Sequence, residues 1–151
     1  MKLLIEPQAA DVVAFGRQQK VMMTLVTKQH LRVQLKRAYA PPSPEDGVRV
    51  LVDRLWPRGL RKSKAAIDRW VKDVAPSTEL RRWFGHDPSR WVEFRRRYKA
   101  ELAHKTELLG ELRAIAQNNT LTLVFAARDE LHNEAIVLRD VPDKLNPSAV
   151  D

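Results

Sequence analysis

Two short apolar runs constrain the fold of this chain more than any other feature of its sequence. Val50 to Val52 and Leu121 to Ala127 present apolar side chains to both faces of an extended strand. Such a strand needs cover on both sides, which is typical of the inner strands of a parallel sheet that is flanked by helices. We therefore predict one inner strand over Val48 to Trp56 and another over Leu121 to Ala127.

The neighbouring segments continue an α/β pattern. Leu31, Val33 and Leu35 alternate with polar residues, which predicts a half-buried strand. Residues 65–75 remain open between two interpretations, because their apolar spacing fits a helix while their length and the closing proline also suit a strand. Helices are predicted over Ser77 to Phe84, Asp87 to about Gln117 and Asn133 to Val141.

Capping and breaking residues set the expected ends of these helices. Ser77 is a typical N-cap, and Asp87 followed by Pro88 is a cap with proline at the first helical position. Inside a helix Gly110 costs about 1 kcal/mol relative to alanine, so we expect a bend or a break there. Pro142 is expected to end the last helix.

Together these segments predict an α/β fold, with a small and mostly parallel sheet of three to four strands and helices packed on its faces. We expect a single domain over residues 31–141, preceded by a poorly patterned N-terminal extension over residues 1–30 and followed by a C-terminal tail over residues 142–151. Met22 and Met23 directly precede the patterned region. A further hypothesis therefore places the start of translation there.

Composition narrows the classes of function. The chain has no cysteine, which excludes a disulfide framework, a thiol nucleophile and a thiolate metal site. Its histidines are scattered without the spacing of metal ligands, so we predict no metal site and no cofactor. No apolar run approaches the roughly 20 residues of a membrane-spanning helix. We expect a cytoplasmic protein without a membrane partner.

Basic residues are concentrated in the middle of the chain. Residues 31–97 hold 17 Lys or Arg and 8 Asp or Glu, a net charge of +9, whereas the net charge of the whole chain is +8. A segment of this charge attracts phosphates and other polyanions. The alternative is that most of these basic side chains are simply solvated.

Charged residues follow each of the three predicted strands. They are Arg37 after the first, Asp53 with Arg54 after the second, and Arg128 with Asp129 after the third. Ligands of open α/β sheets bind beside the carboxyl ends of the strands. We therefore predict a site where these residues meet.

Asp53 and the arginines have different expected roles at this site. Asp53 is the candidate catalytic residue, as a general acid or base, and it is also the candidate partner of a buried Arg37. Arg54, Arg58 and Arg128 are candidates to hold an anionic group such as phosphate. The structural alternative is a fixed pair between Arg37 and Asp53 that joins strand ends and binds nothing.

The loop after the second strand adds Trp56 and Gly59 to the candidates. Gly59, next to Arg58, would let the backbone approach an anion closely. Trp56 either stacks on a ligand or packs over the end of the strand. Ser77 is interpreted as a helix cap in preference to a nucleophile, because no histidine and acid can be assigned to it.

Three stretches of the chain resemble, in order and spacing, the YeaO-like family of bacterial proteins of unknown function. They are "RVLVDRLWPRG", "APSTELRRWFGHDPSRWVEFRRRYKAEL" and "LTLVFAARDELHNEAIVL", and the resemblance runs from Leu31 to Leu138. It implies a compact cytoplasmic α/β domain and favours a strand within residues 65–75. It supplies no established reaction.

The resemblance also marks residues of the expected site. The family motifs correspond here to Asp53, Arg54, Trp56, Pro57, Arg58, Gly59, Ser77, Glu79, Leu80, Arg128, His132 and Asn133. Combined with the strand ends, the predicted ligand-binding set is Arg37, Arg54, Trp56, Arg58, Gly59, Ser77, Arg128, His132 and Asn133.

Three functions are consistent with these observations. The first is binding of a small phosphate-bearing ligand at the carboxyl ends of the strands, with or without catalysis by Asp53. The second is nucleic-acid binding through the basic segment from Arg54 to Arg97, for which no known binding motif is visible. The third is an interaction or structural domain in which the motif serves folding alone.

Overall fold

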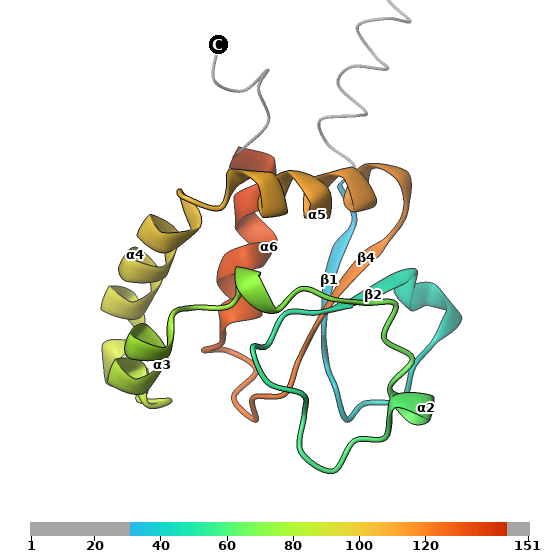
Figure 1. Ribbon diagram of the computed structural model, residues 1–151, viewed down its shortest axis with the longest axis horizontal. Coiled ribbons are helices and arrows are strands. Elements are labelled where there is room, and N and C mark those ends of the chain that lie inside the picture. Colours follow the sequence, from blue (N-terminus) through green and yellow to red (C-terminus); the bar gives the residue numbers. More distant parts are fainter. Residues whose placement is uncertain (1–30, 145–151) are drawn as a thin grey trace, which may run out of the picture. The chain divides into compact units, whose positions relative to one another are not determined.

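The computed structural model describes residues 31–144 (Figure 1). The described residues from Arg32 onward belong to one compact unit. Predictions for the N-terminal extension, for a translation start at Met22 or Met23, and for the chain beyond residue 144 lie outside the described residues.

Four parallel strands form one sheet in the order β1-β4-β2-β3, which confirms the predicted α/β fold. The strands are β1 (Val33–Arg37), β2 (Val48–Leu51), β3 (Arg69–Trp70) and β4 (Leu121–Phe125). Because all four strands run in the same direction, their carboxyl ends lie at one edge of the sheet.

The two inner strands are β4 and β2, as the apolar runs predicted. All five residues of β4 are buried, and Val50 and Leu51 of β2 are fully buried. Thr122 is the polar residue of β4, and its hydroxyl donates a hydrogen bond of 2.6 Å to the carbonyl of Asp46. Since this bond satisfies the hydroxyl, the threonine is tolerated in an otherwise apolar environment.

Both inner strands are shorter than predicted. β4 ends at Phe125 rather than at Ala127, and β2 ends at Leu51 rather than at Trp56. The chain leaves β2 early because Asp53 turns its carboxylate toward a backbone N–H beyond the end of β4. Hydrophobicity alone did not reveal this end of the strand, because apolar residues continue after it.

Residues 65–75 contain a short strand, as the family resemblance implied. A single helical turn, α2 (Lys62–Ala65), precedes β3, and a 3-10 turn covers Lys72–Val74. The indole of Trp70 packs edge-on against that of Trp56, with ring centroids 5.5 Å apart. Of the apolar residues that suggested a helical period, Trp70 therefore lies in a strand and Val74 in the 3-10 turn.

Longer helices and further 3-10 turns complete the domain. They are α3 (Thr78–Phe84), α4 (Trp91–Leu102), α5 (Thr106–Asn118), α6 (Glu134–Lys144) and the 3-10 turns at Pro44–Asp46 and Pro88–Arg90.

Two predicted helix ends were wrong. The long helix from Asp87 to Gln117 is interrupted after Leu102 rather than at Gly110. The chain turns there because α4 packs against α3 and α6, whereas α5 packs against β4 and α6. The last helix continues past Pro142 to Lys144.

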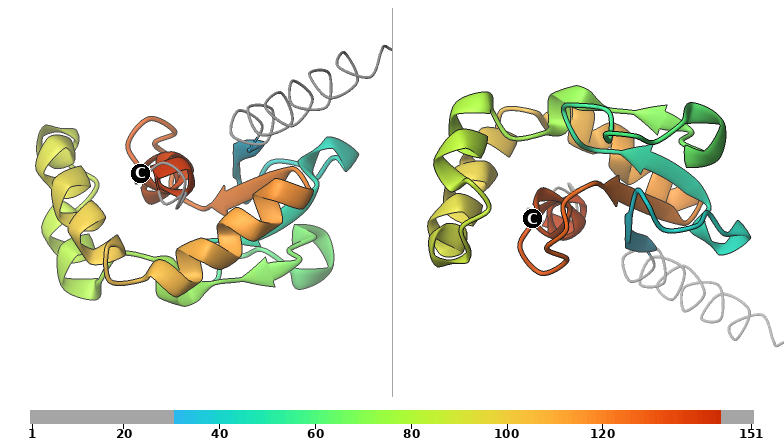
Figure 2. Two further views of the ribbon diagram at one scale, coloured as in Figure 1. Left: turned by 90° about the horizontal axis from the view of Figure 1, so that it is seen from above. Right: turned by 90° about the horizontal axis from the view of Figure 1, so that it is seen from below.

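Helix α6 lies between α4 and the strands, as the views in Figures 1 and 2 agree. It contacts β1, β4, α4 and α5. The start of α6 therefore lies close to the carboxyl end of β4, to which a short loop connects it. Within residues 31–144, no helix is both long and apolar enough to cross a membrane.

Candidate functional site

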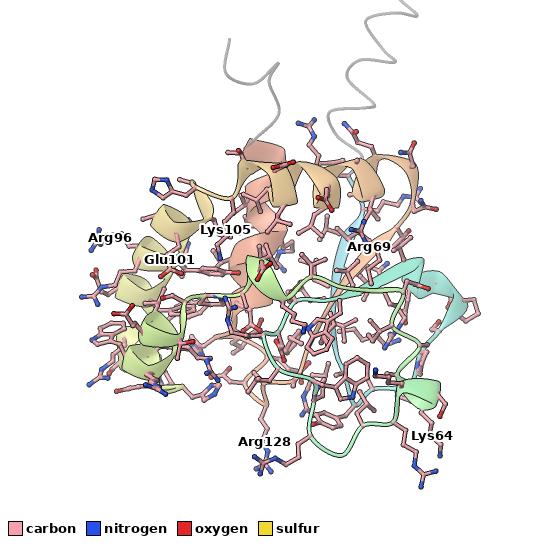
Figure 3. All side chains as sticks on the ribbon, in the orientation of Figure 1. Lys64, Arg69, Arg96, Glu101, Lys105 and Arg128 are labelled. Atoms are coloured by element: carbon pink, nitrogen blue, oxygen red, sulfur yellow. The ribbon has the colours of Figure 1, made fainter. Side chains whose placement is uncertain are left out.

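A cavity of about 650 Å³ lies at the carboxyl ends of β2 and β4. Its wall comes from the loop after β2, from α3 and the residues before it, from α4, and from the loop that joins β4 to α6. Figure 3 shows Arg128, in this last loop, at the edge of the sheet where the strands end. This is the edge at which the charged strand ends predicted a site.

Asp53 is fixed where β2 and β4 end side by side. Its Oδ2 accepts a hydrogen bond of 2.9 Å from the backbone N–H of Ala126. Its carbonyl accepts a hydrogen bond of 2.7 Å from the indole of Trp70. The Oδ1 atom is buried and has no hydrogen-bond partner within residues 31–144. Because an unpaired buried oxygen is costly, this atom needs another donor.

Glu134, the first residue of α6, is a neighbour of Asp53 and also lines the cavity. Its carboxyl lies within hydrogen-bonding reach of the carboxyl of Asp53. Burial raises the pKa of Glu134 well above its ordinary value, and the hydrogen bond with Asp53 and its negative charge raise the pKa further. The raised pKa favours the protonated form of the Glu134 carboxyl.

Three arginines line the cavity without partners of their own. Arg58 follows β2, Arg81 lies on α3, and Arg128 follows β4. All three are exposed, and within the described residues their guanidinium groups form no hydrogen bond or ion pair. We call them the free arginines. Their charge is available to a bound anion, which a guanidinium can contact with two parallel hydrogen bonds.

Arg37 does not pair with Asp53, and that predicted pair is wrong. Its Nε donates a 3.0 Å hydrogen bond to the carbonyl of Ala127, and its Nη2 donates a 3.4 Å bond to the carbonyl of Ala126. Arg37 therefore joins the ends of β1 and β4 and does not line the cavity. The sequence pattern of one strand could not reveal that the acceptors of Arg37 are backbone carbonyls just after another strand.

Arg54 lines the cavity but is directed toward the residues before α3. Its Nη2 lies 3.4 Å from the carbonyl oxygen of Ala75 and 3.5 Å from that of Pro76. Its Nη1 lies 3.9 Å from a carboxylate oxygen of Asp73, which is largely exposed. These contacts make Arg54 a connection between the β2 loop and α3, with less freedom to hold an anion than the free arginines.

Trp56 and Gly59 shape the loop after β2. The indole N–H of Trp56 donates a 2.6 Å hydrogen bond to the carbonyl of Leu60, which supports the packing interpretation, although the ring also lines the cavity. Gly59 has a φ of +78° in a turn closed by a 3.2 Å hydrogen bond from the N–H of Leu60 to the carbonyl of Pro57. The turn requires this conformation, and Gly59 lies outside the cavity wall.

Ser77 lies outside the cavity wall and caps α3, as predicted. Its Oγ accepts a hydrogen bond of 3.1 Å from the N–H of Leu80 and donates one of 2.6 Å to Glu101. Because both functions of the hydroxyl are used, Ser77 has a structural role in this fold.

Asp129, His132 and Asn133 fix the loop after β4. Asp129 accepts hydrogen bonds from the N–H groups of Leu131 and His132 and contacts His132 Nδ1 at 2.9 Å. The Leu131 bond and the contact with His132 hold the pKa of Asp129 below its ordinary value. Asn133 caps α6 by accepting a 3.0 Å bond from the N–H of Ala135. His132 and Asn133 line the cavity, and these contacts hold the loop in place.

The cavity wall carries an excess of positive charge. It contains four arginines, Arg54, Arg58, Arg81 and Arg128, against three acidic residues, Asp53, Asp129 and Glu134. Buried Phe84 and Phe94 add an apolar surface. In residues 31–144 no three His, Asp or Glu side chains are grouped to hold a metal ion.

Residues 32–146 match the model of a family described as the inactive DUF488-N3 subclade. The chain belongs to this family. The match covers the sheet, the helices and every residue of the cavity wall.

Curated relatives confirm the resemblance that the sequence motifs indicated. "Uncharacterized protein YeaO" of Escherichia coli (strain K12) is 44% identical over 110 residues, which are 73% of this chain and 96% of the relative. "Uncharacterized protein Rv3073c" of Mycobacterium tuberculosis (strain H37Rv) is 47% identical over 107 residues, 71% of this chain and 90% of the relative. No solved structure matches this member of the DUF488-N3 subclade.

The sequence of this DUF488-N3 protein did not identify four residues of the cavity wall, namely Tyr39, Arg81, His86 and Glu134. Tyr39 supports the β2 loop, since its hydroxyl donates a 2.8 Å hydrogen bond to the carbonyl of Arg58. A signal for Glu134 was present, because the first residue of a helix that follows a parallel strand lies at the carboxyl edge of the sheet. Arg81 could not be placed before the orientation of α3 was known.

Proposed function

We propose that this protein binds a small phosphate-bearing ligand in the cavity at the carboxyl ends of its strands. The observation that carries the proposal is the convergence of Arg58, Arg81 and Arg128 on one cavity without partners among the described residues. Arginines that are neutralised by carboxylates would offer little to an anion. Three that are not paired give a phosphate several charge-assisted hydrogen bonds.

The size and lining of the cavity support a small ligand. Its volume of about 650 Å³ lies within the range typical of small-molecule sites. Phe84 and Phe94 can cover an apolar part of the ligand, while the arginines surround its anionic part. A cytoplasmic location, where phosphorylated metabolites are abundant, belongs to the same proposal.

Binding without catalysis is the form of the proposal that we favour. The family is described as an inactive subclade, and that description favours a ligand-binding role over a reaction. Asp53, the candidate acid or base, instead has a positioning role, because one carboxylate oxygen is held by Ala126 and the other faces Glu134.

Adjacent arginines on α3 provide a matched test. Arg81 lines the cavity and Arg82 does not, and both are exposed on the same helix. We would identify a binding phosphate ester by thermal shift from sugar phosphates, nucleotides and inorganic phosphate, and then titrate it calorimetrically into Arg81→Gln and Arg82→Gln. Arg81→Gln should weaken binding about tenfold or more, because a hydrogen bond to a charged group contributes roughly 1.5–3 kcal/mol. Arg82→Gln should retain wild-type affinity.

Two results would overturn the proposal. One is that no phosphate compound in the set raises the unfolding temperature. The other is that Arg82→Gln weakens binding as much as Arg81→Gln, which would indicate a general effect of positive charge rather than a cavity.

Nucleic-acid binding is a second candidate, favoured by exposed cations around α2. Arg61, Lys62 and Lys64 are exposed and form no ion pair with another described residue, and Figure 3 shows Lys64 projecting from the domain. Against it, Arg96 and Arg97 of α4 are both paired with Glu93. An RNA whose affinity falls steeply with salt and is lost in a Lys62→Gln, Lys64→Gln double variant would favour this candidate.

A further inference from the structure

Two large apolar side chains that are exposed to solvent line the cavity. Tyr39, shortly after β1, is 44% exposed, and Leu55, in the loop after β2, is 64% exposed. Single exposed apolar residues are ordinary on a protein surface, but two at the wall of one cavity indicate a surface that a ligand covers. The free arginines explain how the cavity would hold a phosphate, and they leave this exposed apolar surface unexplained.

Tyr39 is held in one orientation although it is exposed. Its hydroxyl donates a 2.8 Å hydrogen bond to the carbonyl of Arg58, and the guanidinium of Arg37 lies over its ring, 5.3 Å from the ring centroid. Arg37 is itself fixed by the carbonyls of Ala126 and Ala127. Because the ring is already positioned, a flat group can stack on it without the entropic cost of ordering the side chain.

The same hydrogen bond joins the Tyr39 ring to the cationic part of the cavity. Arg58, whose carbonyl accepts this bond, is one of the free arginines, and its guanidinium is available to an anion. A ligand that uses both features carries a flat ring and a phosphate in one small molecule. A nucleotide has this composition, and its sugar separates the base from the phosphate, so that each can reach a different part of the wall.

We propose that the ligand of the cavity is a mononucleotide whose base stacks on Tyr39 while the free arginines hold its phosphate. This inference rests on the proposed phosphate site. Every base has a π-face that can stack on an aromatic side chain, so Tyr39 selects for the presence of a base without specifying which one. The volume of about 650 Å³ suits a ligand of this size.

Ligands with and without a base test the stacking. The 5′-monophosphates of adenosine, guanosine, cytidine and uridine would be compared with ribose 5-phosphate, which lacks the base, by calorimetric titration of the full chain at neutral pH. We expect at least one nucleotide to bind about tenfold more tightly than ribose 5-phosphate, the size expected of one stacked base. In that complex, nuclear Overhauser effects should connect protons of the base to the ring protons of Tyr39.

Three variants separate the ring from other effects. Tyr39→Leu should weaken nucleotide binding about tenfold and remove most of the preference over ribose 5-phosphate. Tyr39→Phe should keep that preference, because the ring remains although its hydrogen bond to the Arg58 carbonyl is lost. Trp83→Leu is the control. Guanidinium groups of Arg90 and Arg97 lie 5.2 and 4.3 Å from the centroid of the Trp83 ring, but Trp83 lies outside the cavity wall.

The outcomes separate this inference from the proposed function. Equal binding of ribose 5-phosphate and all four nucleotides, with binding still dependent on Arg81, would overturn the nucleotide and leave the phosphate site standing. A preference for nucleotides that survives Tyr39→Leu, or a complex in which the base protons show no contact with the Tyr39 ring, would also overturn it.

Two further outcomes concern the source of the base and the site as a whole. If a 5′-phosphorylated trinucleotide binds more tightly than its first nucleotide alone, the ligand is the end of an RNA chain and the mononucleotide is overturned. If none of these compounds and no inorganic phosphate binds, the phosphate site and the nucleotide fail together.

Discussion

At the scale of single residues, the protonation of Glu134 is the feature with the clearest physical consequence. Burial and the neighbouring Asp53 raise the pKa of its carboxyl well above the ordinary value. The folded protein therefore holds a proton that the unfolded chain releases at a lower pH. Between the unfolded and folded pKa values of Glu134, each rise in pH favours the unfolded state.

Glu134→Gln should flatten this pH dependence. Below the ordinary pKa of 4.5 the carboxyl is protonated in both states, so the variant and wild type should differ little in their pH trend. Above it, the stability of wild type should fall relative to the variant, by at most about 1.4 kcal/mol per pH unit. Urea unfolding at pH 5, 6 and 7 measures the difference, with Glu130→Gln as the control, since Glu130 is exposed and lies outside the cavity wall. A difference that stays constant with pH contradicts the assignment of the proton to Glu134.

Asp46 is a second residue whose surroundings determine stability. It is 3% exposed and contacts Lys36 at 3.0 Å and the buried Arg49 at 2.7 Å. Burial alone would raise its pKa, but hydrogen bonds from Lys36, Ser43 and Arg49 lower it. Asp46 directly precedes β2, and none of Asp46, Lys36 and Arg49 lines the cavity.

Asp46→Ala should destabilise the domain by roughly 3–5 kcal/mol, because it leaves the buried guanidinium of Arg49 without its carboxylate. Asp140→Ala is the comparison, since Asp140 forms only an exposed ion pair with Arg139 and should change stability by less than about 0.5 kcal/mol. Urea unfolding gives both values. Equal effects of the two changes would show that burial of the network does not matter.

Residue-level prediction from the sequence succeeded where spacing along one element sufficed. Ser77 was recognised as a cap, and Asp53 as a residue at a strand end. Prediction failed where the contacting residue belonged to another element. The backbone acceptor of Arg37 lies just after β4. The carboxyl that neighbours Asp53 belongs to Glu134, the first residue of α6. Such partners become visible only when strand order and helix placement are known.

At the scale of elements, the position of the helix break shows what periodicity leaves out. Gly110 has the weakest helix propensity in its segment, yet it lies inside α5. The break follows Leu102 because the two helices pack against different neighbours. Similarly, β2 ends where Asp53 finds a backbone donor rather than where apolar residues end.

Gly110→Ala should stabilise the protein by roughly 0.5–1 kcal/mol, the difference in helix propensity between the two residues. A Cβ at this position meets no atom within 4 Å. The control is Gly47→Ala, which should destabilise, because Gly47 has a φ of +64° and its Cβ would overlap the carbonyl oxygen of Thr120. Denaturant unfolding at 25 °C compares both. A loss of stability in Gly110→Ala would mean that the glycine has a role in α5 beyond its propensity.

At the scale of the whole molecule, the arrangement of charge matters more than its total. The sequence showed a net charge of +9 over residues 31–97 but could not separate paired from unpaired cations. In the fold, Arg49, Arg69, Arg96 and Arg97 are paired with carboxylates. Unpaired cations remain at the cavity and around α2, which is why phosphate-ester binding and nucleic-acid binding are the two functions to compare.

The fold class was predictable from the sequence because two apolar runs and the helices between them specify a covered parallel sheet. The strand order β1-β4-β2-β3 was not predictable, because it depends on how the crossover segments pack. The cavity depends on that order, since β2 and β4 must be neighbours for Asp53 and the loop after β4 to meet.

The measurement that tests the central claim most directly is the NMR response of arginine side chains to inorganic phosphate. The Nε–H signals would be followed during titration, with sodium chloride at matched ionic strength as the reference. We predict saturating shifts for Arg58, Arg81 and Arg128, and little change for Arg82 and for Arg96, which Figure 3 shows on the outer side of α4. Shifts that do not saturate and are spread evenly over all exposed arginines would contradict a phosphate site in the cavity.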